Sequence, residues 1–156
     1  MRLLIARNGE MQKPGGILTE AGVRQVRKLA ASIKDDNLEA IFSSNLPLEQ
    51  ETAGRIGLYH DNVFVMGRDY LSAKRDMGEE ELMEEARAVI EGARNYRSAL
   101  IVTEGKQYHA LTASILGISY QDAQEMGEIK PTALTVFDPF PEMKTYASLA
   151  HLNGSK

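Results

Sequence analysis

The chain has 156 residues, 43% of them hydrophobic and 26% charged, with a formal net charge of −4. This composition is typical of one globular domain, so we expect a single domain over residues 1–156, and no apolar stretch approaches the roughly 20 residues of a membrane-spanning helix. The absence of cysteine excludes disulfides, thiolate catalysis and thiolate metal ligands. The net negative charge argues against a nucleic-acid partner, and without a signal-like N-terminus we expect a cytoplasmic protein.

Short apolar runs alternate with helix-like periodicity along the whole chain. Strands are expected at residues 3–6, 38–42, 63–66, 98–103 and 132–138. Helices are expected at 19–33, 47–58, 79–93 and 106–116, with a short turn from residue 119 and another after residue 142. Loops are expected at 11–16 and 67–78. Prolines follow the last strand and place it at a sheet edge. These elements predict a three-layer α/β/α domain with a mostly parallel central sheet.

The first strand is the apolar run from Leu3 to Ala6, which shows no alternation of polar and apolar residues. Such a run is typical of a central parallel strand that is buried on both faces. Arg7 follows at its carboxyl end, and Thr103 ends the other fully apolar strand. Ligands of open α/β sheets bind outside the carboxyl ends of the strands. We therefore expect the functional site in a crevice shared by these two strand ends.

Four segments carry a recognisable series of motifs. The first strand is followed by Arg-Asn-Gly-Glu at residues 7–10, and residues 18–25 read Leu-Thr-Glu-Ala-Gly-Val-Arg-Gln. Residues 43–53 read Ser-Ser-Asn-Leu-Pro-Leu-Glu-Gln-Glu-Thr-Ala, and residues 99–105 read Ala-Leu-Ile-Val-Thr-Glu-Gly before a helix that ends near Gly117. In order and spacing they resemble the histidine phosphatase (phosphoglycerate mutase-like) superfamily. The resemblance implies that fold for nearly the whole chain, in a compact form similar to the small phosphohistidine phosphatases.

The departures from that family fall on its catalytic positions. The resemblance implies a pocket in which one histidine accepts a phosphoryl group while two arginines and a second histidine hold its oxygens. Here only Arg7 is kept, because Asn8 replaces the nucleophile, Leu48 the helix arginine and Glu104 the second histidine. A carboxamide lacks the basicity to accept a phosphoryl group, and a glutamate repels phosphate. We therefore expect a catalytically inactive pseudophosphatase that acts as a binding or regulatory domain.

The former phosphate crevice remains the candidate binding site. The expected occupant is a small anion, a phosphorylated ligand or a partner protein, and we expect no cofactor. An ion pair between Arg7 and Glu104 is expected, because a guanidinium buried without a partner is costly. Lys106, near a helix N-terminus, is either part of an anion site or simply solvated. The candidate ligand-binding residues are Arg7, Asn8, Gly9, Glu104, Gly105, Lys106 and His109.

Three alternatives remain open from the sequence. His109 lies about one turn into the helix after Glu104, so an active phosphatase or mutase could use it as a non-standard group; otherwise it is a structural histidine. Glu10 and Glu104 could contribute to a metal site, although a hard cation needs more oxygen ligands than these, and we expect no metal. Ser43 and Ser44 are weak candidates for a nucleophile, since no histidine base accompanies them in any motif.

Overall fold

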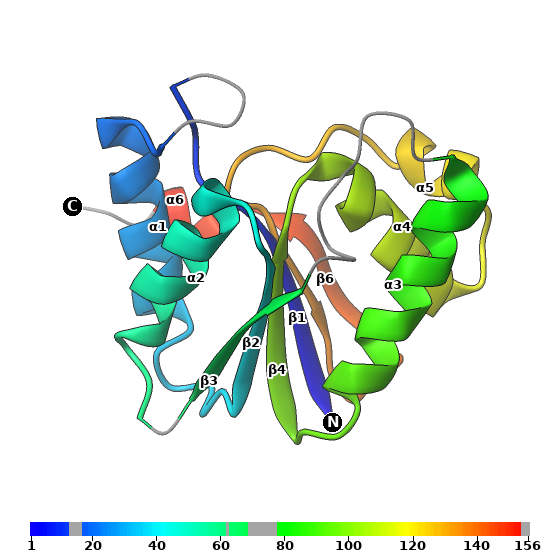
Figure 1. Ribbon diagram of the computed structural model, residues 1–156, viewed down its shortest axis with the longest axis horizontal. Coiled ribbons are helices and arrows are strands. Elements are labelled where there is room, and N and C mark those ends of the chain that lie inside the picture. Colours follow the sequence, from blue (N-terminus) through cyan, green and yellow to red (C-terminus); the bar gives the residue numbers. More distant parts are fainter. Residues whose placement is uncertain (13–16, 62, 69–77, 154–156) are drawn as a thin grey trace.

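The computed structural model describes residues 1–12, 17–61, 63–68 and 78–153. In this part of the chain six strands form one mixed sheet in the order β3-β2-β4-β1-β5-β6 (Figure 1). Strands β1 (Arg2–Arg7), β2 (Ala40–Ser44), β3 (Phe64–Arg68) and β4 (Ser98–Thr103) are parallel. Strands β5 (Leu134–Phe137) and β6 (Met143–Ser148) extend the sheet antiparallel to their neighbours. The predicted mostly parallel sheet is confirmed.

Helices cover both faces of this sheet. Helices α1 (Glu20–Ser32) and α2 (Pro47–Gly57) lie on one face, with the short α6 (Ala150–Asn153) beside α1 (Figure 1). Helices α3 (Glu79–Ala93), α4 (Gly105–Leu116) and α5 (Tyr120–Glu125) lie on the other face. The predicted three-layer α/β/α architecture is therefore confirmed. None of the helices in the described part of the chain has the length and apolar character needed to cross a membrane.

Two hydrophobic clusters, one on each face, anchor the central strands. Leu3 and Ile5 of β1 pack toward α3 and α4, whereas Leu4 and Ala6 pack toward α1 and α2. All four are fully buried. A strand with apolar residues on both of its faces can be buried on both sides, as a central strand of the sheet is. The register of β1 with β4 brings Arg7 opposite Thr103, so the carboxyl ends of the two strands meet as expected.

The predicted helix ends are confirmed by their capping contacts. The Thr19 side chain caps α1 by accepting from the Gly22 backbone amide at 2.9 Å. The Ser119 side chain caps α5 by accepting from the Asp122 amide at 3.0 Å. Gly117 ends α4 in the left-handed region, at φ 70°, which glycine adopts without steric cost. These caps fix where each helix leaves the sheet.

The C-terminal segment differs from the prediction. Residues 143–148 form β6 instead of a helical turn, and only residues 150–153 are helical. Pro139 and Pro141 end β5 as expected, but the Asp138 amide then donates to the Glu142 carbonyl at 2.9 Å and the chain turns back along β5. Strand β5 is therefore an inner strand. The expected edge position was wrong because β6 is half exposed and lacks the alternation that marks a strand in sequence.

Two further boundaries shift. Strand β2 starts at Ala40 and includes Ser43 and Ser44, both fully buried, so these serines continue the strand that we expected to end at residue 42. Strand β3 starts one residue later than expected and extends through Arg68 at the sheet edge, where Phe64 is 65% exposed. The predicted loops at 11–16 and 67–78 fall largely on residues 13–16 and 69–77, which lie outside the described residues.

Candidate functional site

The crevice begins where β1 ends. The Asn8 amide donates to the Thr103 carbonyl at 3.0 Å, which ties the end of β1 to the end of β4. On the other side, the Thr132 amide donates to the carbonyls of both Arg7 and Asn8 at 3.1 Å. Thr132 holds φ 61°, a conformation that a β-branched residue adopts only when its surroundings impose it. The backbone of Arg7 and Asn8 is therefore fixed from both sides.

The Arg7 guanidinium lies against the backbone of a neighbouring segment. Its Nη1 atom donates to the Ile129 backbone carbonyl, in the segment before β5. The side chain is partly buried, and its Nε atom is buried without a hydrogen-bond partner. Arg7 is the one phosphate-pocket position at which the chain keeps the residue that the resemblance implies.

Asn8 faces a residue that was not among the sequence candidates. The Asn8 side chain is 4% exposed, and its Nδ2 atom donates to Oε1 of Glu49 at 3.3 Å. Glu49 lies in the first turn of α2 and is 3% exposed, and its second oxygen, Oε2, has no hydrogen-bond partner. A buried, incompletely satisfied carboxylate beside the position of a family nucleophile is a feature of the site.

A signal for Glu49 was present in the sequence. Positions 49, 52, 53 and 56 share one face of α2, and the other three are Thr52, Ala53 and Ile56, all fully buried. The face was recognisable from its i, i+3, i+4, i+7 spacing. An acidic residue on the apolar face of a helix that starts at the carboxyl end of a strand indicates a carboxylate turned toward the crevice.

Burial raises the pKa of the Glu49 carboxyl, and the negative charge of Glu104 raises it further. The backbone amide of Glu49 itself and the Ser44 hydroxyl oppose this rise. The charge of Glu104 is therefore close enough to act on the Glu49 carboxyl.

Glu104 caps its own helix instead of pairing with Arg7. Its carboxylate accepts from the backbone amides of Lys106 at 2.9 Å and Gln107 at 2.8 Å, at the N-terminus of α4. The predicted Arg7–Glu104 ion pair is wrong: both residues are described, and no ion pair joins them. The desolvation argument was sound, but each charge finds backbone partners, Arg7 at Ile129 and Glu104 at its own helix.

The glycines and the lysine of the predicted site have distinct surroundings. Gly9 donates its amide to Thr52 Oγ1 at 3.4 Å. A Cβ there would come within 2.8 Å of the Leu18 and Val26 side chains and 3.0 Å of the Gly22 carbonyl oxygen, so its neighbours would have to shift. Gly105 starts α4 with open space around it. Lys106 is exposed, and its backbone amide is already used by the Glu104 cap.

His109 packs against α5. Its ring lies edge-on to Tyr120 with 6.3 Å between ring centroids, and its Nδ1 atom is buried without a hydrogen-bond partner. Burial lowers its pKa, so the imidazole is neutral at pH 7. Of the other two histidines, His60 follows α2 at the opposite end of the sheet. His151 of α6 lies beside the candidate site, 3.1 Å from the hydroxyl of Thr132, whose amide donates to the carbonyls of Arg7 and Asn8.

The metal and serine alternatives find no support in the geometry. Among the described residues, no group of three or more histidine, aspartate or glutamate side chains could hold a metal ion. Glu10 instead accepts from the Thr19 hydroxyl at 3.0 Å, beside the start of α1. The Ser43 hydroxyl donates to the Ser44 carbonyl at 3.0 Å, and the Ser44 hydroxyl accepts from the Leu46 amide. Both serines serve the turn between β2 and α2.

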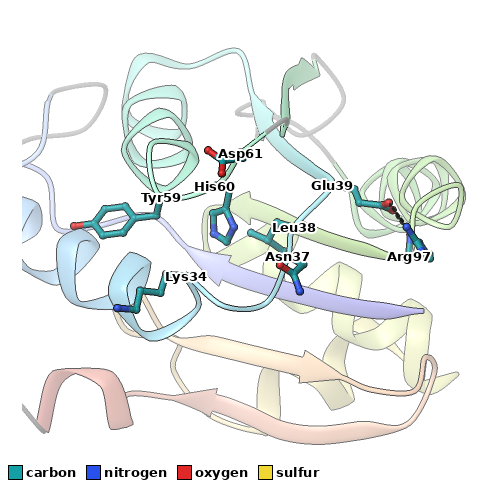
Figure 2. Close-up of a pocket in the computed structure, with 8 residues that line it drawn as sticks. All are labelled: Lys34, Asn37, Leu38, Glu39, Tyr59, His60, Asp61 and Arg97. Atoms are coloured by element: carbon teal, nitrogen blue, oxygen red, sulfur yellow. Dashed lines mark hydrogen bonds and ion pairs between the residues drawn. The ribbon is translucent and has the colours of Figure 1, made fainter.

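A pocket lies at the opposite end of the sheet, before β2 and β4. Figure 2 shows His60 projecting toward Asn37 and Leu38 in this pocket of about 380 Å³. At its rim the Glu39 carboxylate accepts from the Arg97 backbone amide at 2.6 Å, and this bond lowers the pKa of Glu39. The pocket collects charges of both signs. The candidate site stays at the carboxyl ends of β1 and β4, because the motif residues Arg7, Asn8 and Glu104 lie there.

Replacing Glu49 with glutamine should stabilise the protein by about 1 kcal/mol near pH 8 and by less near pH 4.5. Because the pKa of Glu49 is raised in the folded state, the native protein binds more protons than the unfolded chain between the ordinary value and the raised one. The penalty for its buried charge therefore grows as the pH rises through that interval, and glutamine removes it.

Urea unfolding at the two pH values measures this difference. Exposed Glu125 on α5 provides a matched control, and Glu125→Gln should change stability little at either pH. An equal effect of Glu49→Gln at both pH values would contradict the buried-charge interpretation.

No protein-family profile matches the sequence, and no curated protein matches it. Solved structures do. Phosphoserine phosphatase from Entamoeba histolytica, in complex with 3-phosphoglyceric acid, matches with a TM-score of 0.77 and 18% identity over 97% of this chain and 98% of that one. A mycobacterial glucosyl-3-phosphoglycerate phosphatase matches at 0.79 and 15% over 94% and 98%. A putative alpha-ribazole-5'-P phosphatase from Escherichia coli matches at 0.77 and 15% over 96% and 98%.

These matches are full-length on both sides, so neither fold carries a large element that the other lacks. At such low sequence identity, the matches show a shared fold and do not show a shared activity. They agree with the fold that the motif order predicts. The chain has the fold of the histidine phosphatase superfamily.

Proposed function

We propose that this protein is a catalytically inactive histidine phosphatase-like domain that binds a ligand or a partner through the former phosphate crevice. The observation that carries the proposal is the environment of Asn8. A carboxamide ends the strand where the family resemblance implies the nucleophilic histidine, and its amide is held by the buried Glu49. A carboxamide has no lone pair basic enough to accept a phosphoryl group at neutral pH.

The electrostatics of the crevice support the same proposal. Phosphoryl transfer depends on positive charge around the phosphoryl oxygens, and helix N-termini often supply part of it. Here the N-terminus of α4 is occupied by the carboxylate of Glu104, and Glu49 lies buried in the first turn of α2. Leu48 fills the position that the resemblance assigns to an arginine, and it is 5% exposed. A dianionic transition state would meet two acids and a single arginine.

One of the similar solved structures holds a ligand although a histidine has been replaced. A variant of the Entamoeba histolytica phosphoserine phosphatase, with one histidine replaced by alanine, was solved in complex with phosphoserine and matches this chain with a TM-score of 0.77 at 16% identity. In that protein the loss of a histidine is compatible with an occupied site. For this chain we propose a small phosphorylated or anionic ligand, or a partner protein, as the occupant of the crevice.

The purified protein should not hydrolyse p-nitrophenyl phosphate above the buffer rate between pH 5 and 8. After incubation with this ester, the mass spectrum of the protein should show no added phosphate. Asn8→His alone should not create activity, because Leu48 and Glu104 still leave the phosphoryl oxygens without their positive partners.

The alternative function, an active enzyme that uses His109, makes the opposite prediction. A rate that disappears in His109→Ala and persists in His60→Ala would refute the proposal in favour of that alternative. His60 is the matched control because it lies at the other end of the sheet, in the pocket of Figure 2.

A further inference from the structure

A pocket of about 360 Å³ lies between α3, α4 and the turn that joins β5 to β6. The two helices pack side by side on one face of the sheet (Figure 1). The Phe140 amide donates to the Met1 carbonyl at 2.8 Å, which holds the turn beside the amino end of β1. Arg7 lies at the other end of this strand, so the pocket is separate from the candidate site. A volume of this order is typical of small-molecule sites.

The pocket is lined in part by apolar side chains that continue the core. Ile90 of α3 is 7% exposed, and Ile115 of α4 and Phe140 pack against the same buried cluster. The Phe140 ring lies edge-on to the fully buried Phe137, with 6.5 Å between ring centroids. Pro141 adds a further apolar surface. Because these groups offer a ligand no hydrogen bond, they favour an apolar body.

Two arginines give the same pocket a positive charge. Arg87 and Arg94 are seven residues apart on α3, so they share a helix face with Ile90. Arg94 is already engaged, because its Nη1 atom donates to Oε1 of Glu91 at 3.2 Å and its guanidinium lies 5.7 Å from the centroid of the Phe140 ring. Arg87 is exposed, and none of the five ion pairs found among the described residues includes it. The pocket therefore combines apolar surface with one guanidinium that no carboxylate neutralises.

We propose that this pocket binds a small monocarboxylate with an apolar body, its carboxylate on Arg87 and its body against Ile90 and Ile115. A guanidinium binds a carboxylate through paired N–H groups, which orients the ligand as well as attracting it. A carboxylate without an apolar body gains little more than an exposed ion pair. An apolar body without a charge leaves Arg87 to water. The inference adds a site to the proposed function and does not depend on it.

A set of matched small molecules tests the two parts of the ligand separately. Phenylacetate, 3-phenylpropanoate and hexanoate carry both parts, their uncharged carboxamides lack the charge, and acetate lacks the apolar body. Binding is followed by ¹H–¹⁵N NMR titration, in which the backbone amides of Ser114 and Ile115 report on the pocket and the side-chain amide of Asn8 reports on the crevice. We expect at least one of the three acids to bind about fivefold more tightly than its carboxamide and about tenfold more tightly than acetate.

Substitutions on exposed positions of α3 assign the carboxylate to its partner. Arg87→Gln should reduce the affinity of the best acid to that of its carboxamide and leave carboxamide binding unchanged. Glu91→Gln removes the acid of the pocket and releases Arg94, so it should tighten binding about threefold. Arg24→Gln is the matched control, because Arg24 is exposed on α1, on the other face of the sheet, and it should leave the affinity unchanged. The dispersion of the NMR spectrum shows whether each variant is folded.

Three results would overturn the proposal. The first is an acid that binds no more tightly than its carboxamide or acetate, and the second is unchanged binding by folded Arg87→Gln. The third is a titration that moves the Asn8 signal and leaves Ser114 and Ile115 in place, which would put the ligand in the crevice. If Arg87→Gln does not fold, Glu91→Gln decides, and an unchanged affinity there counts against the pocket. The proposed function fails separately, by turnover of p-nitrophenyl phosphate.

Discussion

Gly22→Ala should destabilise the protein by about 3 kcal/mol, because a Cβ at this position has no room. Gly22 lies in the first turn of α1, and the added carbon would be closer to the Glu10 carbonyl oxygen than real Cβ atoms come to any neighbour. It would also lie 3.1 Å from the backbone nitrogen of Glu10. Backbone atoms cannot rotate away as a side chain does, so α1 or the segment after β1 must shift.

Chemical denaturation of the purified variant measures this loss. Gly54→Ala provides a matched control, because Gly54 lies within α2, is exposed and has nothing within 4 Å of the added carbon. Alanine there should stabilise the protein by roughly 0.5–1 kcal/mol through helix propensity. Equal effects of the two substitutions would mean that the contact between α1 and Glu10 does not constrain the fold. Glu10 lies two residues after Asn8, so a shift of its backbone should also change the NMR signal of the Asn8 side chain.

Tyr108→Phe should cost about 2 kcal/mol, although it removes only one oxygen atom. The Tyr108 side chain is fully buried on α4, and its hydroxyl contacts the carbonyl of Ile5 at 3.2 Å, the carbonyl of Ala133 at 3.1 Å and Oγ1 of Thr135 at 2.6 Å. Burial raises the pKa of this hydroxyl, so it stays neutral throughout the physiological range. Phenylalanine keeps the ring contacts but leaves the Thr135 hydroxyl and the carbonyls without that partner.

Thermal and urea unfolding of Tyr108→Phe measure the loss. Tyr59→Phe is the control, since Tyr59 is 41% exposed just after α2, and the substitution should change the free energy of unfolding by less than about 0.5 kcal/mol. A Tyr108→Phe protein as stable as this control would show that the buried hydroxyl is not a net stabilising link between α4, β1 and β5.

The fold could be predicted because its main signals are local. The apolar runs of β1 and β4 have no polar residue to place at a surface, so they must be central, and the caps at Thr19, Ser119 and Gly117 depend on a few neighbouring residues. The order of four motifs then predicted the histidine phosphatase fold, which the structural matches confirm. Strand β6 was not predicted, because its pairing with β5 is a tertiary contact and its half-exposed residues show no strand pattern.

The placement of three candidate residues could be predicted, but their contacts could not. Arg7, Asn8 and Glu104 do lie together at the ends of β1 and β4, since the parallel register brings them there. Their hydrogen-bond partners could not be predicted from the sequence. Arg7 donates to the Ile129 carbonyl and Glu104 accepts from backbone amides of α4, and such backbone groups occur whatever the residue type. Glu49 was missed because it matches no catalytic position of the family motifs, and only its place on the buried face of α2 marks it.

The cap formed by Glu104 bears on how this chain could evolve. Putting histidine at that position would remove the acceptor of two backbone amides at the start of α4, a loss of about 1 kcal/mol for a typical cap. That loss would come before any gain in reactivity, because Asn8 and Leu48 would still be in place. Under the proposed function, a chain with this carboxylate would therefore pass through less stable intermediates, with no immediate benefit, before it could transfer a phosphoryl group.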